Sequence, residues 1–197
     1  MSSNARLFSA ISLGVLLIAI GLISFVNLSS RRTLGSAGVA PETVPLSQSG
    51  TVAAGKLAAN FKLKDLKGNE ISLASMRGKV VFLNIWATWC APCREEMPSI
   101  ESLYNDFKAD KDFMVLAVSQ DTDGGIVAPF VKQNHFQFTV LLDPRNDVGE
   151  RYDVNGIPET FIIGRDGRIV AHHVGPYDWS NADIREALQE LIKSRQG

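Results

Sequence analysis

The sequence predicts an α/β domain with a mixed central β-sheet flanked by helices, preceded by one N-terminal transmembrane helix. Two apolar, β-branched runs, at residues 80–87 and 113–118, predict buried strands, and each is followed by a segment with helical spacing of its apolar residues. Strands that alternate with helices favour a sheet covered on both faces. From Leu7 to Leu28 the chain carries no charged residue, and about 20 apolar residues are enough to cross a bilayer.

We therefore expect three segments: a membrane anchor or uncleaved signal at 1–28, a flexible linker at 29–54, and a folded domain at 55–197. The linker is rich in Ser, Gly, Ala, Thr and Pro and has no periodic apolar pattern. A cleavable signal peptide has an apolar core of only about 7–15 residues, which favours retention. Small residues at 36–40 keep cleavage open as an alternative. Arginines flank both ends of the apolar run, so the positive-inside rule does not fix its orientation.

The composition excludes some function classes. The chain has 197 residues, is 45% hydrophobic and has a formal net charge of −1, so it has no basic field for a nucleic acid. It also lacks a glycine-rich phosphate-binding loop. Gly124 and Gly125 are adjacent, but the other residues of the dinucleotide-binding motif (G-x-G-x-x-G) and of the P-loop motif (G-x-x-x-x-G-K-[ST]) are missing.

The folded domain begins with a predicted β-hairpin. Apolar and polar residues alternate at 61–65 and at 70–73, around a turn in which Gly68 can adopt a positive φ. A single helical turn ended by Gly78 follows. The later elements are predicted from the same periodicities, with a capping box at 180–183 starting the last helix. They are strand 80–87, helix 94–108 with Pro98 inside it, strand 113–118, helix 126–134, strand 140–142, helical piece 147–152, hairpin strands 160–163 and 169–173, and the C-terminal helix.

The two cysteines of the chain, Cys90 and Cys93, form a C-x-x-C at a predicted strand-to-helix turn. A helix N-terminus offers unpaired N–H groups and a partial positive charge. Cysteines in such places have pKa values lowered to roughly 3.5–7.5, and the thiolate is the attacking form. Pro92 stiffens the turn. We predict that Cys90 attacks a disulfide and that Cys93 resolves the mixed disulfide.

Two other interpretations of the pair are weaker. Half of a zinc site would need His135, His172 or His173, none of which has the spacing of a zinc finger. A structural disulfide that closes so small a ring removes little chain entropy. We expect no metal and no cofactor beyond the redox-active disulfide, and we expect His172 and His173 on a strand surface.

Trp89-Cys90-Ala91-Pro92-Cys93, Pro98 five residues after the second cysteine, and the later run 156–161 (Gly-Ile-Pro-Glu-Thr-Phe) together resemble the thioredoxin fold. With the leading hairpin and the anchor, the chain resembles the membrane-anchored TlpA/ResA/CcmG-like thiol-disulfide oxidoreductases over roughly residues 56–194. The resemblance implies that Cys90 is the attacking cysteine, that Cys93 is the resolving cysteine, and that Pro158 is a cis-proline facing the disulfide.

Further site residues follow from this resemblance. Ile157 would present its backbone to an extended client segment, and Trp89 would be a partly exposed flank. Asn84 stands in the place of the buried aspartate of thioredoxin, so Glu96 is expected to be the base for the resolving thiol. Glu96 lies at i+3 from Cys93, on nearly the same helix face, and partial burial would raise its pKa. Alternatively, it is an ordinary acid near a helix start.

Glu159 is the other candidate base, and we expect it to contact clients instead. Trp86 is expected in the core.

The expected function is an extracytoplasmic, membrane-anchored and monomeric thiol-disulfide oxidoreductase. It would reduce client disulfides, such as those of apocytochrome c during cytochrome c maturation, with electrons from a membrane thiol carrier. One alternative is a peroxiredoxin-like peroxidase, but Leu83 and Ala87 stand where its P-x-x-x-T/S-x-x-C signature needs other residues. The other is a non-enzymatic copper chaperone. The sequence leaves the client, the electron donor and the direction of electron flow open.

Overall fold

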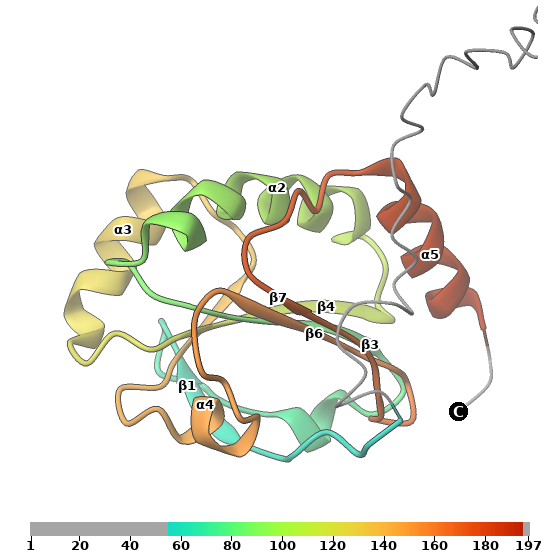
Figure 1. The fold of residues 1–197 in the computed structure, drawn as a ribbon, viewed down its shortest axis with the longest axis horizontal. Coiled ribbons are helices and arrows are strands. Elements are labelled where there is room, and N and C mark those ends of the chain that lie inside the picture. The colour runs from blue at the N-terminus through green and yellow to red at the C-terminus, as the bar shows by residue number, and fades with distance from the viewer. Residues whose placement is uncertain (1–54, 195–197) are drawn as a thin grey trace, which may run out of the picture. The chain divides into compact units, whose positions relative to one another are not determined.

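A seven-stranded mixed sheet with helices on both faces makes up residues 55–194, the part of the chain that the computed structural model describes (Figure 1). The predicted anchor at 1–28 and the predicted linker at 29–54 lie outside the described residues. Within residues 55–194, no helix combines the length and the apolar character needed to cross a membrane.

The strand order in the sheet is β2-β1-β5-β4-β3-β6-β7. The neighbours β3, β4 and β5 are parallel, and all other neighbouring pairs are antiparallel. The strands are β1 (Lys62–Asp65), β2 (Glu70–Ser72), β3 (Val80–Trp86), β4 (Phe113–Ser119), β5 (Thr139–Leu142), β6 (Glu159–Ile163) and β7 (Ile169–Val174). The helices are α2 (Ala91–Phe107), α3 (Val127–Gln133), α4 (Asp147–Arg151), α5 (Ala182–Lys193) and the 3₁₀ turns η2 (Leu73–Met76) and η3 (Gly124–Ile126).

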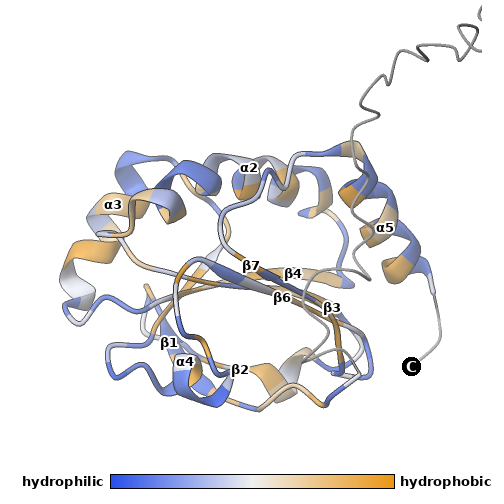
Figure 2. Ribbon diagram, viewed as in Figure 1, coloured by the Kyte–Doolittle hydropathy of each residue, from blue (hydrophilic) through white to orange (hydrophobic). Residues whose placement is uncertain are grey.

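Strand β3 is the centre of the core, because all seven of its residues are buried. Side chains of successive strand residues point to opposite faces. Phe82 and Trp86 accordingly pack in the cluster with α2, α3 and α5, whereas Leu83 and Ile85 pack in the cluster that contains residues of α4 and η2. Figure 1 shows α2, α3 and α5 on one side of the sheet and α4 on the other. Figure 2 shows β3 and β4 as hydrophobic strands in the middle layer.

N-terminal segments lie at both edges of the sheet. The predicted hairpin forms β1 and β2, with Gly68 at φ +86° in its turn, and β1 pairs with β5, so the hairpin extends the same sheet. At the other edge, the Gly55 N–H donates to the Ile169 carbonyl (2.7 Å), and the Ala58 N–H donates to the Gly167 carbonyl (2.9 Å). The described chain therefore starts beside the β6–β7 turn.

Helix α2 has Cys90 at its N-terminus, as the strand-to-helix turn predicts, and so starts before the apolar periodic run at 94–108. It begins at Ala91 instead of residue 94, because Cys90 acts as its N-cap and Pro92 occupies its first turn, where a missing N–H costs nothing. The helix then continues through Pro98 to Phe107. The redox pair therefore belongs to the helix start itself.

Candidate active site

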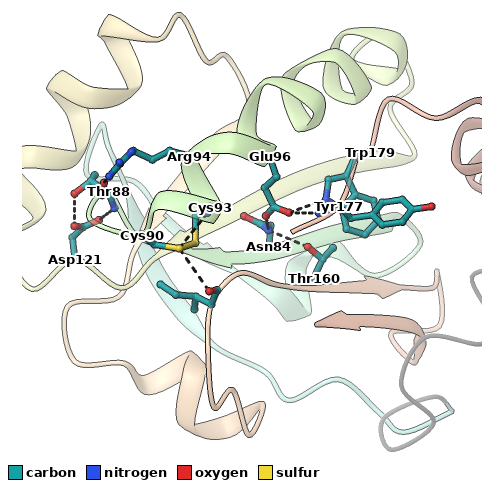
Figure 3. Close-up of a disulfide and its surroundings, with 11 residues drawn as sticks. Asn84, Thr88, Cys90, Cys93, Arg94, Glu96, Asp121, Thr160, Tyr177 and Trp179 are labelled. Carbon is teal, nitrogen blue, oxygen red and sulfur yellow. Dashed lines mark hydrogen bonds between the residues drawn. A yellow bond between two sulfur atoms is a disulfide. The ribbon is translucent and has the colours of Figure 1, made fainter. Parts of the chain in front are cut away.

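The two cysteines differ in exposure. Cys90 and Cys93 form a disulfide, with their Cα atoms 5.3 Å apart. The Cys93 N–H donates to Cys90 Sγ (3.2 Å), which makes the sulfur of Cys90 the cap of α2. Cys90 retains 5% of its surface, and Cys93 is fully buried. Of the two cysteines, only Cys90 therefore has surface that a client can reach. Figure 3 shows the disulfide and its surroundings.

The loop before Cys90 is held by a buried carboxylate. Asp121, just after β4 and 1% exposed, accepts hydrogen bonds from the backbone N–H (2.9 Å) and the hydroxyl (2.6 Å) of Thr88. The Ser119 hydroxyl also donates to Asp121 (2.7 Å). On the other side of the loop, the Arg94 guanidinium donates to the Thr88 carbonyl (2.9 Å). Four side chains thus hold the loop that leads to Cys90 in place.

The loop before β6 lies against the disulfide. The Ile157–Pro158 peptide bond is cis, as the resemblance implies, and the Ile157 carbonyl oxygen is 3.7 Å from Cys90 Sγ. The Gly175 N–H donates to the Pro158 carbonyl (2.9 Å) and ties this loop to the end of β7. The backbone of Ile157 therefore lies where the sequence places it, beside the attacking sulfur.

A groove of about 580 Å³ adjoins Cys90. Trp89, which is 66% exposed, and Ile157 both line it. Gln120, Asn146 and Asn155 add carboxamide groups, and none of the lining residues is charged. A neutral, partly aromatic groove suits an extended protein segment better than an anionic small molecule.

Glu96 is a buried carboxylate one helical turn beyond Cys93. It is 4% exposed, and its Oε1 accepts a hydrogen bond from the Asn84 amide (2.8 Å). Its Oε2 accepts from the Tyr177 backbone N–H (3.2 Å) and from the Trp179 indole N–H (3.3 Å). Burial raises the pKa of Glu96 from 4.5 to about 7, against the opposing effect of these hydrogen bonds. A carboxyl group with this pKa can take up or release a proton near neutral pH.

Glu96 also has a route to solvent. A cleft of about 540 Å³ between α2 and the segment before α5 is lined by Glu96 together with Ser99, Tyr177 and Asp178. The carboxyl group lies on the helix face of Cys93, since the two residues are three apart. The cleft is therefore the candidate route by which a proton on Glu96 would reach solvent.

Comparison with known proteins agrees with this geometry. The AhpC/TSA family model matches residues 54–172. The thiol-disulfide oxidoreductase ResA of Halalkalibacterium halodurans is 31% identical over 194 residues, which cover 98% of each chain. ResA of Bacillus thuringiensis subsp. konkukian is 37% identical over 139 residues, 71% of this chain and 76% of that protein. The chain belongs to the AhpC/TSA family, among ResA-like thiol-disulfide oxidoreductases.

Solved structures of this family are similar as well. A protein described as a thiol:disulfide interchange protein DsbE, from Chlorobium tepidum, is 35% identical with a TM-score of 0.60, covering 71% of this chain and 94% of that one. StoA from Bacillus subtilis is 26% identical with a TM-score of 0.57, covering 70% and 98%. The ResA-like chain is therefore a protein thiol-disulfide oxidoreductase with a thioredoxin-like fold, which favours disulfide exchange over the peroxidase and copper-chaperone alternatives.

The prediction for Glu159 in this ResA-like domain requires correction. Its side chain is 5% exposed and pairs with His172, Oε2 to Nε2 at 2.8 Å. Glu159 stands in register with Ile85, on the sheet face opposite to Asn84 and Glu96. The carboxylate is therefore not free to contact a client. It also points away from the side of the sheet that carries Cys93, because successive residues of a strand point to opposite faces and it is Thr160, not Glu159, that pairs with Asn84.

The two adjacent histidines lie on the edge strand β7, as predicted, but both are partly buried. His172 stacks on Phe161, with ring centroids 4.2 Å apart, and its side chain is 14% exposed. His173 packs against Tyr177 and Trp179 on the other face. Among residues 55–194, no three His, Cys, Asp or Glu side chains gather into a metal-binding group.

Several site residues had no clear signal in the sequence. Tyr177 and Trp179 reach Glu96 from 81 and 83 residues away, and no spacing rule joins such distant positions. Asp121 does have a signal, because it lies two residues after the buried strand β4, and functional side chains of α/β sheets gather at the carboxyl ends of strands.

Proposed function

We propose that this ResA-like protein reduces client disulfides outside the cytoplasm, as a monomer tethered to the membrane by its N-terminal segment. The observation that carries the proposal is the pairing of one reachable sulfur, Cys90 beside a neutral groove, with one buried sulfur, Cys93, next to a carboxyl group of near-neutral pKa. Dithiol exchange needs this division between an accessible nucleophile and a protected resolving thiol.

The proposed cycle starts from the reduced pair. The Cys90 thiolate attacks a client disulfide, forms a mixed disulfide, and releases one client thiolate, which takes a proton from solvent. The Cys93 thiol then gives its proton to Glu96 and attacks Cys90 Sγ. This step forms the Cys90–Cys93 disulfide and releases the second client thiolate. Two electrons pass to the client, and a membrane thiol carrier restores the reduced pair.

The reductive direction has its own test. The reduction potential of the Cys90–Cys93 pair is expected near the roughly −270 mV of thioredoxin, measured by equilibration with glutathione. A value near the roughly −120 mV of DsbA would instead indicate an oxidant. The resemblance to TlpA/ResA/CcmG-like proteins supports oxidised apocytochrome c as a client in cytochrome c maturation.

The tether and the location rest on the sequence. The uncharged run from Leu7 to Leu28 supports an anchor at 1–28, followed by a linker at 29–54 and the catalytic domain at 55–197. Because the chain has only two cysteines, a membrane-impermeant thiol reagent reports the side of the membrane directly. After reduction, Cys90 of the full-length chain is expected to react in intact cells. Labelling only after lysis would contradict the extracytoplasmic location.

The variant Cys93→Ser tests the roles of the two sulfurs. It is expected to accumulate mixed disulfides between Cys90 and clients, because the resolving attack is lost. Non-reducing gels and mass spectrometry of the trapped species would identify the clients. Cys90→Ser is the matched control and is expected to trap nothing. Equal trapping by both variants, or trapping by neither, would contradict the assignment.

A further inference from the structure

The donors to Glu96 come from two different parts of the fold. Asn84 of β3 binds Oε1, whereas both donors to Oε2 belong to the segment between β7 and α5: the backbone N–H of Tyr177 and the indole N–H of Trp179. The indole is the single side-chain donor to Oε2. Figure 3 shows Tyr177 and Trp179 on one side of the Glu96 carboxylate, joined to it through nitrogen atoms, with Asn84 below it.

Trp179 itself is firmly held. It is 2% exposed, its backbone N–H donates to the Ser99 hydroxyl (3.1 Å), and its ring meets Phe82 edge-on with centroids 4.8 Å apart. Tyr177 lies against the same indole at 5.0 Å. An indole fixed by contacts on several sides is a preorganised donor, so it binds the carboxylate without losing further conformational freedom.

We propose that Trp179 is a positioning residue for thiol-disulfide exchange, whose indole N–H holds Glu96 in place and stabilises its ionised form as the proton acceptor of Cys93. The role rests on the function proposed above for Glu96. In the resolving step the proton leaves Cys93 Sγ and arrives on the Glu96 carboxylate. The indole favours this acceptor form, because an ionised carboxylate accepts a hydrogen bond more strongly than a neutral carboxyl group.

Other titratable groups surround Glu96. Cys93 and the exposed Glu95 lie on its own helix, and Tyr177 and Asp178 on the segment before α5. His173 of β7 packs against the Trp179 ring. Hydrogen bonds from Ser180 lower the pKa of Asp178, and burial lowers the pKa of His173. Both pKa values are therefore shifted downward, in the direction opposite to that of Glu96. The neighbours from β3 and β6, Asn84 and Thr160, do not titrate.

The first measurement is the pH profile of turnover on a model protein disulfide. Trp179→Phe is expected to move the midpoint upward by about one pH unit, since the ionised carboxylate loses a hydrogen bond. Trp86→Phe is the matched control, because Trp86 is equally buried and its indole nitrogen has no partner in the described structure. The midpoints are compared over a pH range in which circular dichroism shows both variants fully folded, so that they report the active site and not unfolding. A Trp179→Phe midpoint equal to that of wild type would overturn the proposal.

The second measurement needs no turnover. With Trp86 and Trp89 replaced by Phe, Trp179 is the single tryptophan, since the chain has three. Its fluorescence in the oxidised protein is expected to titrate near the pKa of Glu96, about 7, and to lose this transition in Glu96→Gln. A transition that persists in Glu96→Gln would assign it to His173 and overturn the proposal. If the fluorescence transition depends on Glu96 but the protein does not turn over protein disulfides, the proposed function would be refuted, while the contact between Trp179 and Glu96 would still be supported.

Discussion

The difference between Cys90 and Cys93 arises from position within one helical turn. Cys90 caps α2 and reaches the groove, whereas Cys93 points into the core formed by α2 and β3. The N-terminal end of the helix favours a thiolate at the cap, and burial hides the second sulfur until a mixed disulfide forms. The attacking and resolving roles therefore follow from location.

The variant Asp121→Asn tests the support of the loop before Cys90. Asparagine keeps one oxygen, but it removes the negative charge and brings an N–H₂ group toward the Thr88 and Ser119 hydroxyls. The charge-assisted hydrogen bonds are therefore weakened, and at least one hydroxyl must turn from donor to acceptor. We expect the free energy of unfolding to fall by about 1–3 kcal/mol, with slower reaction of Cys90 because its loop loosens. Urea denaturation and alkylation rates measure the two effects.

Glu186→Gln is the control for Asp121→Asn. Glu186 is an exposed acid on α5, and substitutions at such surface positions usually change stability by less than about 0.5 kcal/mol. Equal stability of the two variants would show that Asp121 does not hold the loop.

At the residue scale, the sequence could place site residues together where the signal was local, and their catalytic roles stay predictions. Cys90, Cys93 and Glu96 lie within seven residues, and helical spacing relates Glu96 to Cys93. The contact from Trp179 to Glu96 depends on how the segment before α5 crosses α2, and no local pattern contains that crossing. The prediction for Glu159 failed for a different reason. Glu159 is the first residue of β6, and the sequence does not show which residues of this strand point to which face of the sheet.

Among the elements, α4 shapes the groove through one glycine. A Cβ at Gly149 would overlap the side-chain oxygen of Asn146 and crowd the amide nitrogen of Gln120, two residues that line the groove. Gly149→Ala must displace this pair, so we expect a loss of roughly 1–3 kcal/mol in stability and slower exchange with protein disulfides. Thermal denaturation and insulin reduction assays measure these effects.

Gly156→Ala is the matched control for α4. Gly156 lines the same groove, but a Cβ there meets no atom within 4 Å. Its stability and activity are expected to stay near those of wild type. If Gly149→Ala has the same stability and activity as Gly156→Ala, the side chains of Asn146 and Gln120 can move without a loss of stability.

Elements with long, continuous apolar runs were predictable, and short ones were less so. Strands β3 and β4 agree with the prediction within one residue at each end, because buried central strands have an unambiguous pattern. The predicted helix at 126–134 instead begins as the 3₁₀ turn η3 and continues as α3. The place of the hairpin beside β5 is a long-range pairing, which its own sequence does not encode.

For the whole molecule, Glu96 makes stability depend on pH. The native pKa is raised from 4.5 to about 7, so the native state binds a proton more tightly than the unfolded state. This contribution to stability is full below pH 4.5 and is lost as the pH rises through 7. Relative to wild type, Glu96→Gln is expected to gain about 2–3 kcal/mol between pH 5 and pH 8, measured by urea denaturation.

Glu95→Gln is the neighbouring control for this pH effect. Glu95 is exposed on the same helix, so its difference from wild type is expected to stay nearly constant between the two pH values. A constant difference for Glu96→Gln as well would mean that Glu96 ionises in the native protein as it does in the unfolded chain.

The hydrogen bonds of Gly55 and Ala58 to the β6–β7 turn have a practical consequence. Ile169 pairs with Ile163, which in turn pairs with Val81 near the start of β3, whereas Cys90 follows the end of this strand. Seven residues of strand span about 20 Å. If the domain were attached to an electrode or a bead through its chain just before Gly55, the attachment point would therefore lie at the end of the domain opposite to Cys90 and Cys93. The disulfide would face the solution.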